Sequence, residues 1–271
     1  EANPGAGHGV GASPDWLQAA AHRAIQRGGS ALTSFRALHR NERVSAEARD
    51  VLVTVDEWTG CEVADPPPRG GPCVIGLDLG GSRSMSAAAW YWPETRRLEV
   101  LGVFPGEPSL AERGVMDGIA GRYRDMAERG ELMTMGGRVV PAGAFMSEVM
   151  RRVEGERVVA LCADRFRQAE VLEAAAEAGV RAPFAWRGQG WKDGGEDVER
   201  FRRAVFEGRV AAPPSLLMRS ALADAVCLSD PAGNRKLAKA RSTGRIDAAA
   251  AAVLAVAEGA RQAARPQRAA G

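Results

Sequence analysis

The run Cys73–Leu79, with the sequence CVIGLDL, is the most informative stretch of this chain for its fold and chemistry. Apolar residues and one glycine surround a single acid, which predicts a buried strand, and Gly80-Gly81 ends it. Asp78 is the unusual member, because burial of a carboxylate is costly unless it is paired or binds a cation. A turn cap at the strand end is the alternative role for this aspartate. We therefore take Asp78 as the first candidate metal ligand.

Two further aspartates occupy comparable positions. Asp164 closes a second apolar run, VVALCAD at Val158–Asp164, just before an expected helix, and Asp247 opens an alanine-rich helix. Each of them alone also suits a helix N-terminus, as a cap or beside the helix dipole. With Asp78 they place acids at two strand ends and on one facing helix, a set that can hold two Mg²⁺ or Mn²⁺ ions for phosphodiester cleavage. We expect all three to be catalytic metal ligands.

A basic segment leads into Asp247. Residues 234–245, NRKLAKARSTGR, carry five positive charges and no acid. A solvated surface loop is the alternative for any such run. Because a scissile phosphate beside Asp247 needs neutralising, we expect DNA-binding roles for four of these five basic side chains, which are Lys236, Lys239, Arg241 and Arg245.

Composition excludes several other chemistries. The formal net charge is only +2, so affinity for nucleic acid has to come from local clusters of basic residues. All histidines lie within the first forty residues, which argues against a Ser-His-Asp triad or an HExxH zinc site farther along. No GxxxxGK[ST] motif is present, so the chain has no P-loop. Carboxylates, basic side chains and metal ions are left to perform any chemistry there.

Cysteine spacing and the ends of the chain add further expectations. The cysteines show no CxxC spacing and are expected to be reduced core thiols; they are Cys61, Cys73, Cys162 and Cys227. No apolar run is long enough to span a bilayer, and no membrane role is expected. The N-terminus lacks both the pattern of a signal peptide and an initiator Met, which favours a fragment or a processed chain.

A break in the chain predicts its organisation. Residues 65–72, DPPPRGGP, cannot continue a helix or a strand. We therefore predict a first part at 1–64, a main domain at 65–265 and a flexible tail at 266–271. In the first part, Pro14–Arg27 is predicted to be a helix, whereas Phe35–Trp58 is mixed and polar.

The main domain is predicted to be α/β with a mixed sheet flanked by helices. Three strand-like runs with hairpin connections come first, and alternating strands and helices follow, so three antiparallel strands should gain parallel neighbours. The predicted strands are Cys73–Leu79, Met85–Trp92, Leu98–Phe104, Arg157–Ala163 and Pro183–Trp186, with Leu132–Val139 left open. The predicted helices are Ala111–Glu128, Ala142–Val153, Arg167–Ala178, Glu196–Glu207, Ser215–Val226 and a last one from Asp247.

A glycine-rich loop lies between two tryptophans. Trp186 and Trp191 flank Arg187–Gly190, RGQG, which has the composition of an exposed loop. Contact with DNA is one interpretation of the tryptophans. Packing of the pair against the core to hold the loop is the commoner role for such residues.

The chain resembles the C-terminal part of the large terminase subunit of tailed bacteriophages, the motor that packages DNA. The likeness rests on GLDLGGS at 76–82 and on DPAGNRK at 230–236 followed by GRIDAA at 244–249. Upstream, SFRALHRN at 34–41 and EWTGC at 57–61 are similar to that family's linker, and EANP at 1–4 resembles the last strand of its ATPase domain.

The resemblance implies an RNase H-like nuclease whose acids fall on Asp78, Asp164 and Asp247. It implies Mg²⁺- or Mn²⁺-dependent cleavage of concatemeric double-stranded DNA in the bacterial host cytoplasm. The implied partners are a terminase small subunit, a portal protein and an N-terminal ATPase domain that this chain lacks. One position departs from the pattern: many relatives carry a further Asp where Ser84 stands, which puts metal affinity and metal preference in doubt.

Two alternatives from other classes stay open. IGLDLGGS at 75–82 also resembles the first phosphate loop of sugar kinases and actin-like ATPases, but those need a second such loop, and none follows here. A catalytically degenerate module for DNA binding or assembly in a packaging machine is the other alternative, and Ser84 favours it. Metal dependence separates this module from the nuclease, and nucleotide binding tests the ATPase.

Overall fold

The computed structural model describes residues 13–27, 51–81, 84–119, 121–230, 234–238 and 245–264. The chain divides into two compact units, Glu1–Val51 and Leu52–Gly271. The first unit contains α1 (Pro14–Arg27), the helix predicted there. The rest of the polar region predicted before residue 51 lies outside the described residues, as do the tail at 266–271 and the sequences at 1–4 and 34–41.

The second unit contains the α/β domain. Its strands are β1 (Cys73–Asp78), β2 (Ser86–Trp92), β3 (Arg97–Pro105), β4 (Leu132–Met135), β5 (Val158–Asp164), β6 (Phe184–Arg187), β7 (Cys227–Ser229) and β8 (Arg235–Leu237). Its helices are α3 (Val55–Thr59), α4 (Leu110–Met116), α5 (Arg122–Glu128), α6 (Ala142–Arg151), the 3₁₀ helix η1 (Arg165–Arg167), α7 (Gln168–Glu177), α8 (Trp191–Phe206), α9 (Leu216–Asp224) and α10 (Asp247–Ala263).

A six-stranded mixed sheet in the order β4-β3-β2-β1-β5-β6 forms the centre of this unit. Strands β1, β2 and β3 pair antiparallel, while β5 adds parallel to β1 and β6 adds parallel to β5. This agrees with the predicted arrangement. At the opposite edge, β4 adds parallel to β3, within the segment that the sequence left open. Strands β7 and β8 form a separate antiparallel pair that was not predicted.

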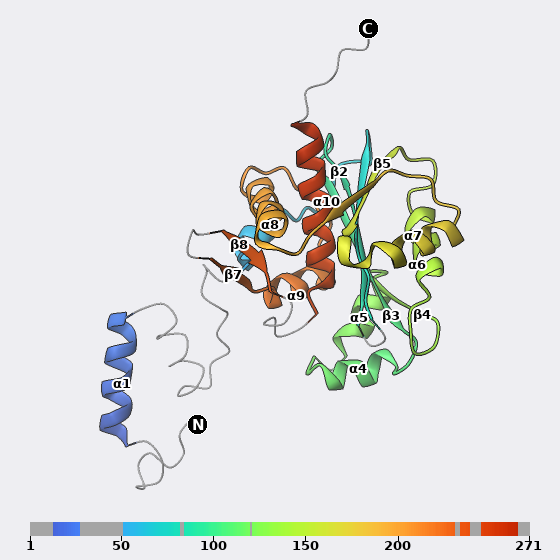
Figure 1. Cartoon of the computed structure of the whole chain (residues 1–271). Helices are drawn as coiled ribbons and strands as arrows, with labels where there is room; N and C mark the ends of the chain where they lie inside the picture. The colour runs from blue at the N-terminus through green and yellow to red at the C-terminus, as the bar shows by residue number, and fades with distance from the viewer. Residues whose placement is uncertain are drawn as a thin grey trace. The chain divides into compact units, whose positions relative to one another are not determined.

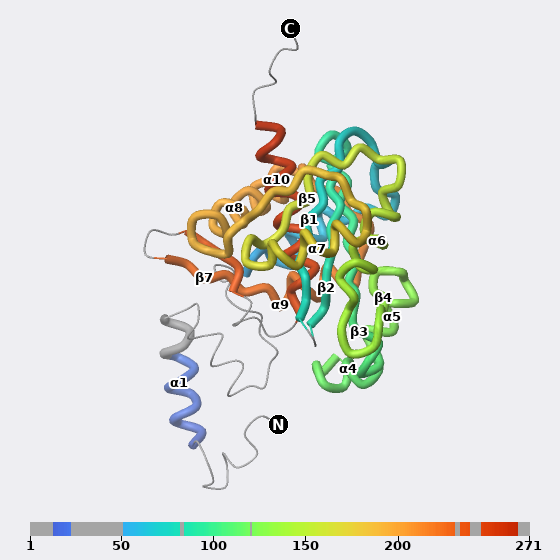
Figure 2. The backbone as a smooth tube through the Cα atoms, turned by 45° about the vertical axis from the view of Figure 1, so that its right-hand side comes forward, coloured from blue at the N-terminus to red at the C-terminus, as the bar shows by residue number. Residues whose placement is uncertain are grey.

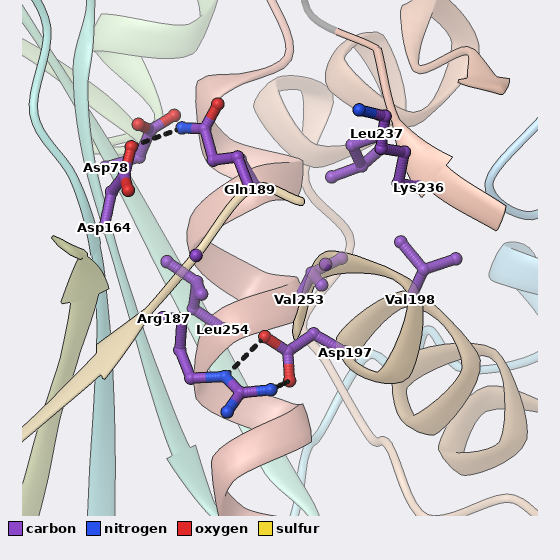
Figure 3. A pocket seen from close by; sticks show the side chains of 13 residues that line it. Asp78, Asp164, Arg187, Gln189, Asp197, Val198, Lys236, Leu237, Val253 and Leu254 are labelled. Atoms are coloured by element: carbon purple, nitrogen blue, oxygen red, sulfur yellow. Dashed lines mark hydrogen bonds and ion pairs between the residues drawn. The ribbon is translucent and has the colours of Figure 1, made fainter. Parts of the chain in front are cut away.

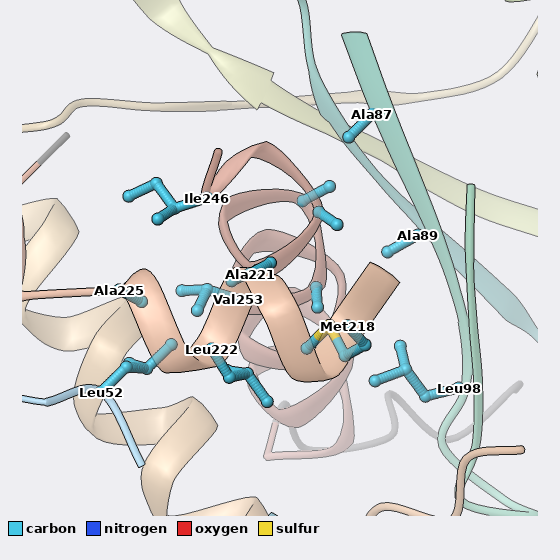
Figure 4. Close-up of a cluster of buried hydrophobic side chains, with 14 of the residues drawn as sticks. Leu52, Ala87, Ala89, Leu98, Met218, Ala221, Leu222, Ala225, Ile246 and Val253 are labelled. Atoms are coloured by element: carbon cyan, nitrogen blue, oxygen red, sulfur yellow. The ribbon is translucent and has the colours of Figure 1, made fainter. Parts of the chain in front are cut away.

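Helices cover both faces of the sheet (Figure 1; Figure 2). On one face α6 and α7 pack over a core that includes Ile75, Leu77 and Trp90. On the other face α10 lies against β1 and β2, and α8 and α9 pack outside it. Figure 4 shows α9 crossing α10 beside Ala87 and Ala89 of β2. Small residues dominate that second face because the helix backbone comes very close to the strands.

The closest approach is between Gly76 and α10. A Cβ atom at Gly76 would lie 2.0 Å from the carbonyl oxygen of Ala251 and 2.7 Å from the amide nitrogen of Ala255. Farther along the helix, Gly259 lies against Tyr91, whose register partner on β1 is Val74. Helix α10 therefore runs antiparallel to β1, so its first residue lies at the end of the sheet that carries Asp78.

The unit begins before the boundary predicted at residue 65. Helix α3 begins with a capping box between Thr54 and Glu57. Trp58 of this helix is buried and stacks on Phe201 of α8 with ring centroids 6.5 Å apart. Glu62 then forms a parallel bridge to Ala212. The polar composition of this stretch gave no sign that Trp58 is buried. The Pro-rich break at residues 65–72 therefore lies inside the unit.

The helix predicted at Ala111–Glu128 was wrong as a single element. The structure has α4 and α5, separated by a turn in which Gly118 adopts a positive φ of 71°. That left-handed conformation ends the first helix and is one that glycine adopts at little cost. Helix α8 also starts earlier than predicted, at Trp191 in place of Glu196.

All four cysteines are free and buried, as expected for core thiols. Burial raises the pKa of Cys73 and Cys162 to about 12, so these thiols stay protonated near neutral pH. In the part of the chain that the structure describes, no helix is both long and apolar enough to cross a membrane.

Candidate metal and phosphate site

The ends of two parallel strands bring Asp78 and Asp164 together. Gly76 pairs with Cys162 and Leu77 with Ala163, so the next step of that register sets Asp78 beside Asp164. Adjacent strands lie about 5 Å apart, and alternate residues share a face of the sheet. The two carboxylates therefore point to the α10 side, where both line one pocket (Figure 3). Asp78 is buried, with 7% of its surface exposed.

Both carboxylate oxygens of Asp164 accept hydrogen bonds. The Phe166 backbone N–H donates to Oδ1 at 3.0 Å, which is the N-cap interaction weighed from the sequence. The side-chain amide of Gln189 donates from Nε2 to Oδ2 at 2.5 Å, and Figure 3 shows it pointing across the pocket to the aspartates. Gln189 lies in the glycine-rich loop that follows β6. The sequence marked this loop for exposure but did not single out its glutamine.

The loop is fixed by the start of α8. The Gly188 backbone N–H donates to Asp193 Oδ2 at 2.9 Å, and this bond lowers the pKa of the Asp193 carboxyl, with Arg187 and Arg165 acting in the same direction against burial. Arg187 pairs with Asp197 through bonds of 2.8 and 2.9 Å. Burial lowers the pKa of Arg187, but the bond to Asp197 and nearby acids outweigh it and raise the pKa. These bonds hold the backbone on the N-terminal side of Gln189 against α8.

One predicted basic residue reaches this pocket. Lys236 on β8 lines it, opposite the aspartates in Figure 3. Its Nζ lies 4.6 Å from the ring centroid of Trp191, a cation–π contact that fixes the direction of the lysine. Lys239 and Arg241 lie outside the described residues.

Arg245 is engaged elsewhere. Its guanidinium pairs with Asp117, with Nε 3.0 Å from Oδ2, and lies 5.8 Å from the ring centroid of Phe104. Burial works against its charge, but the Asp117 hydrogen bond prevails and raises the pKa of Arg245. It lines a different pocket, with Tyr123 and Met126. The structure therefore shows Arg245 anchoring the segment before α10 to the end of α4.

Asp247 lies at the same end of the sheet but does not line the pocket. Helix α10 contributes Ala250, Val253 and Leu254 to the lining. Asp247 is the first residue of that helix, one turn before Ala250, and is half-buried. Ser84, in the connection after β1, does not line the pocket either. Across the described residues, no three His, Cys, Asp or Glu side chains come together closely enough to hold a metal ion.

The donor set nevertheless fits a hard divalent cation. Asp78 and Asp164 offer carboxylate oxygens, and the amide of Gln189 offers a third oxygen after rotation about its last torsion. Mg²⁺ is usually bound by one or two carboxylates while it keeps several waters, so two aspartates at one pocket meet its usual demand. A buried acid at a strand end also gains most from such a charge partner.

Comparisons with known proteins agree with this architecture. No family model matches the chain. A curated protein, "Terminase, large subunit" of Enterobacteria phage HK97, is 29% identical over 227 residues, which cover 82% of this chain and 44% of that protein. The crystal structure of the HK97 large terminase matches with a TM-score of 0.70 and 25% identity, over 92% of this chain and 51% of the other.

The chain is similar in sequence and in fold to the HK97 large terminase subunit. The family resemblance and the RNase H-like mixed sheet predicted from the sequence are confirmed by this match. The chain spans about half the length of the proteins it matches. A large terminase nuclease from thermophilic phage G20c is a weaker match, with 14% identity over 72% of this chain and 93% of that one and a TM-score of 0.47.

Proposed function

We propose that this chain is the nuclease portion of a terminase large subunit and cleaves double-stranded DNA with divalent metal ions during phage DNA packaging. The observation that carries the proposal is the pair of strand-end carboxylates, Asp78 and Asp164, in one pocket with Lys236. The homology to a large terminase supplies the biological setting. The implied partners are the small subunit, the portal and the ATPase part of the motor, in the host cytoplasm.

In this proposal the residues have distinct tasks. Asp78 and Asp164 hold Mg²⁺ or Mn²⁺, and Asp247 supports the site from the start of α10. Divalent ions bound there supply an activated water and neutralise charge on the leaving oxygen. Gln189 holds the Asp164 carboxylate in place. Lys236, oriented by Trp191, neutralises the phosphate of the bound strand.

The test is cleavage of supercoiled plasmid by the purified chain in Mg²⁺, Mn²⁺ or EDTA, beside Asp247→Asn. We expect nicked and linear products with either ion and none in EDTA. Because Asp247 lies one turn behind the pocket, its loss should slow cleavage about 10–100-fold, the usual effect of residues that support metal ligands.

Other results would redirect the assignment. Cleavage by Asp247→Asn at the wild-type rate would remove Asp247 from the site. A folded wild type that is inert with both ions, but still binds DNA, would favour the non-catalytic packaging module. One observation favours this non-catalytic module: among the described residues, no third carboxylate lies beside Asp78 and Asp164.

A further inference from the structure

Phe166 is the most exposed large apolar side chain in the described part of the molecule. Its surface is 93% accessible, although the residue lies directly between β5 and α7. Single exposed apolar residues are common and need no explanation by themselves. Phe166 differs by its place: it lines an open cleft together with Asp78, Asp164 and Gln189, on the outer side of the candidate metal site.

The backbone under this ring is held firmly. Asp164 caps the turn by accepting the Phe166 N–H at 3.0 Å. One residue farther, the Arg167 guanidinium donates to the Gly80 carbonyl at 3.1 Å and pairs with Glu170. The 3₁₀ turn is therefore tied both to a proposed metal ligand and to the loop after β1. A ring that is exposed on a fixed backbone loses little conformational freedom when it binds a flat partner.

A cation beside the ring remains available to a ligand. The Arg165 side chain is 64% exposed, and its guanidinium lies 4.0 Å from the carboxylate of Asp193, a long ion pair. Arg167, by contrast, is committed to Gly80 and Glu170. The cleft thus combines an accessible aromatic face, an accessible guanidinium and the two carboxylates that are proposed to hold a metal ion, which would bind a phosphate. An aromatic face beside a basic side chain is the pairing that binds single strands, through base stacking and backbone neutralisation.

We infer that Phe166 stacks on an unpaired base next to the scissile phosphate, and that Arg165 contacts the neighbouring phosphate. This inference rests on the proposed function and names the form of DNA that the site takes. In an intact duplex both faces of each base are covered by neighbouring bases, so the ring has no free face to bind. The site should therefore prefer a strand that is locally opened, gapped or single-stranded.

The test is binding of fluorescein-labelled oligonucleotides, single-stranded and duplex at matched length, measured by fluorescence anisotropy with Ca²⁺ in place of Mg²⁺. The variants are Phe166→Ala and Phe166→Trp. Stacking on one base predicts that Phe166→Ala binds the single strand about tenfold more weakly, with a change of less than about twofold for the duplex. Phe166→Trp should keep the wild-type preference. Thermal melting shows that each variant is folded.

Phe206→Ala is the matched control. Phe206 is also an exposed phenylalanine, at 54%, but it ends α8 and lines neither the pocket nor the cleft. The inference is overturned if Phe166→Ala binds both DNA forms as tightly as the wild type, or if it loses the same affinity for both forms. It is also overturned if the wild type does not bind the single strand.

The plasmid assay separates this inference from the proposed function. If the wild type cleaves DNA in a metal-dependent way, but Phe166→Ala binds the single strand as tightly as the wild type does, the nuclease function is retained and the stacking role is rejected. Binding that depends on Phe166, without cleavage in Mg²⁺ or Mn²⁺, would retain the stacking role and reject the nuclease.

Discussion

Asp78→Asn is expected to lower metal-dependent DNA cleavage by about 10³-fold, the upper range for loss of one preorganised electrostatic group in an active site. Asn keeps the shape of the side chain but removes the negative charge that, in the proposed site, would hold a cation at the end of β1. Because Asp78 is buried, the substitution also changes the interior of the domain, so the melting temperatures of both proteins in EDTA are compared. A variant that melts as a folded protein and does not cleave DNA has lost the site and not the fold.

Two measurements make this prediction specific. Mn²⁺ should raise the melting temperature of the wild type and not that of Asp78→Asn, since a ligand stabilises only the state that binds it. Asp125→Asn on α5 is the control, because its carboxylate is exposed and lines neither the pocket nor the cleft; it should cleave like the wild type. Equal cleavage by Asp78→Asn and wild type would refute the role of Asp78.

Gly76→Ala is expected to give the largest loss of stability. The added Cβ would lie 2.0 Å from a backbone carbonyl oxygen of α10, where no flexible side chain can move aside. Either the helix or the central strand has to shift, so we expect the upper end of the usual cost of overpacking, about 3 kcal/mol. For a domain of this size that corresponds to a fall in melting temperature of roughly 6–12 °C. Because Asp78 follows on the same strand, cleavage should fall as well.

Gly137→Ala is the matched control for this substitution. Gly137 is exposed, has no heavy atom within 4 Å of a Cβ position, and does not adopt a positive φ. Its melting temperature should stay within about 2 °C of wild type, as for most surface changes. A Gly76→Ala variant that melts with the wild type would show that α10 does not pack on β1 as described.

The central strands were predictable because each is a short apolar run bounded by turn residues. The parallel placement of Asp78 and Asp164 follows from strand order, so the sequence indicated their meeting. Helix breaks were less accessible: the division at Gly118 depends on its left-handed backbone, and one glycine within a helical pattern does not reveal that. The early start of the unit depends on Trp58 reaching Phe201, a contact across the chain.

The surroundings of the site were harder to predict for the same reason. The hydrogen bond between Gln189 and Asp164 depends on how the loop after β6 folds back over β5. Arg245 was predicted to bind DNA because it lies near Asp247, but its ion pair with Asp117 joins residues 128 positions apart. Charge along the sequence indicated a basic segment, and only the folded chain separates Lys236 at the pocket from Arg245 beside α4.

The candidate metal site is tested most directly by a crystal structure of the chain grown with Mn²⁺, with anomalous diffraction used to locate the ion. We expect a Mn²⁺ peak coordinated by oxygens of Asp78 and Asp164, with the amide of Gln189 displaced from or rotated toward the ion. Protein that cleaves DNA in Mn²⁺ yet binds the ion elsewhere, with the Gln189–Asp164 hydrogen bond intact, would contradict this expectation.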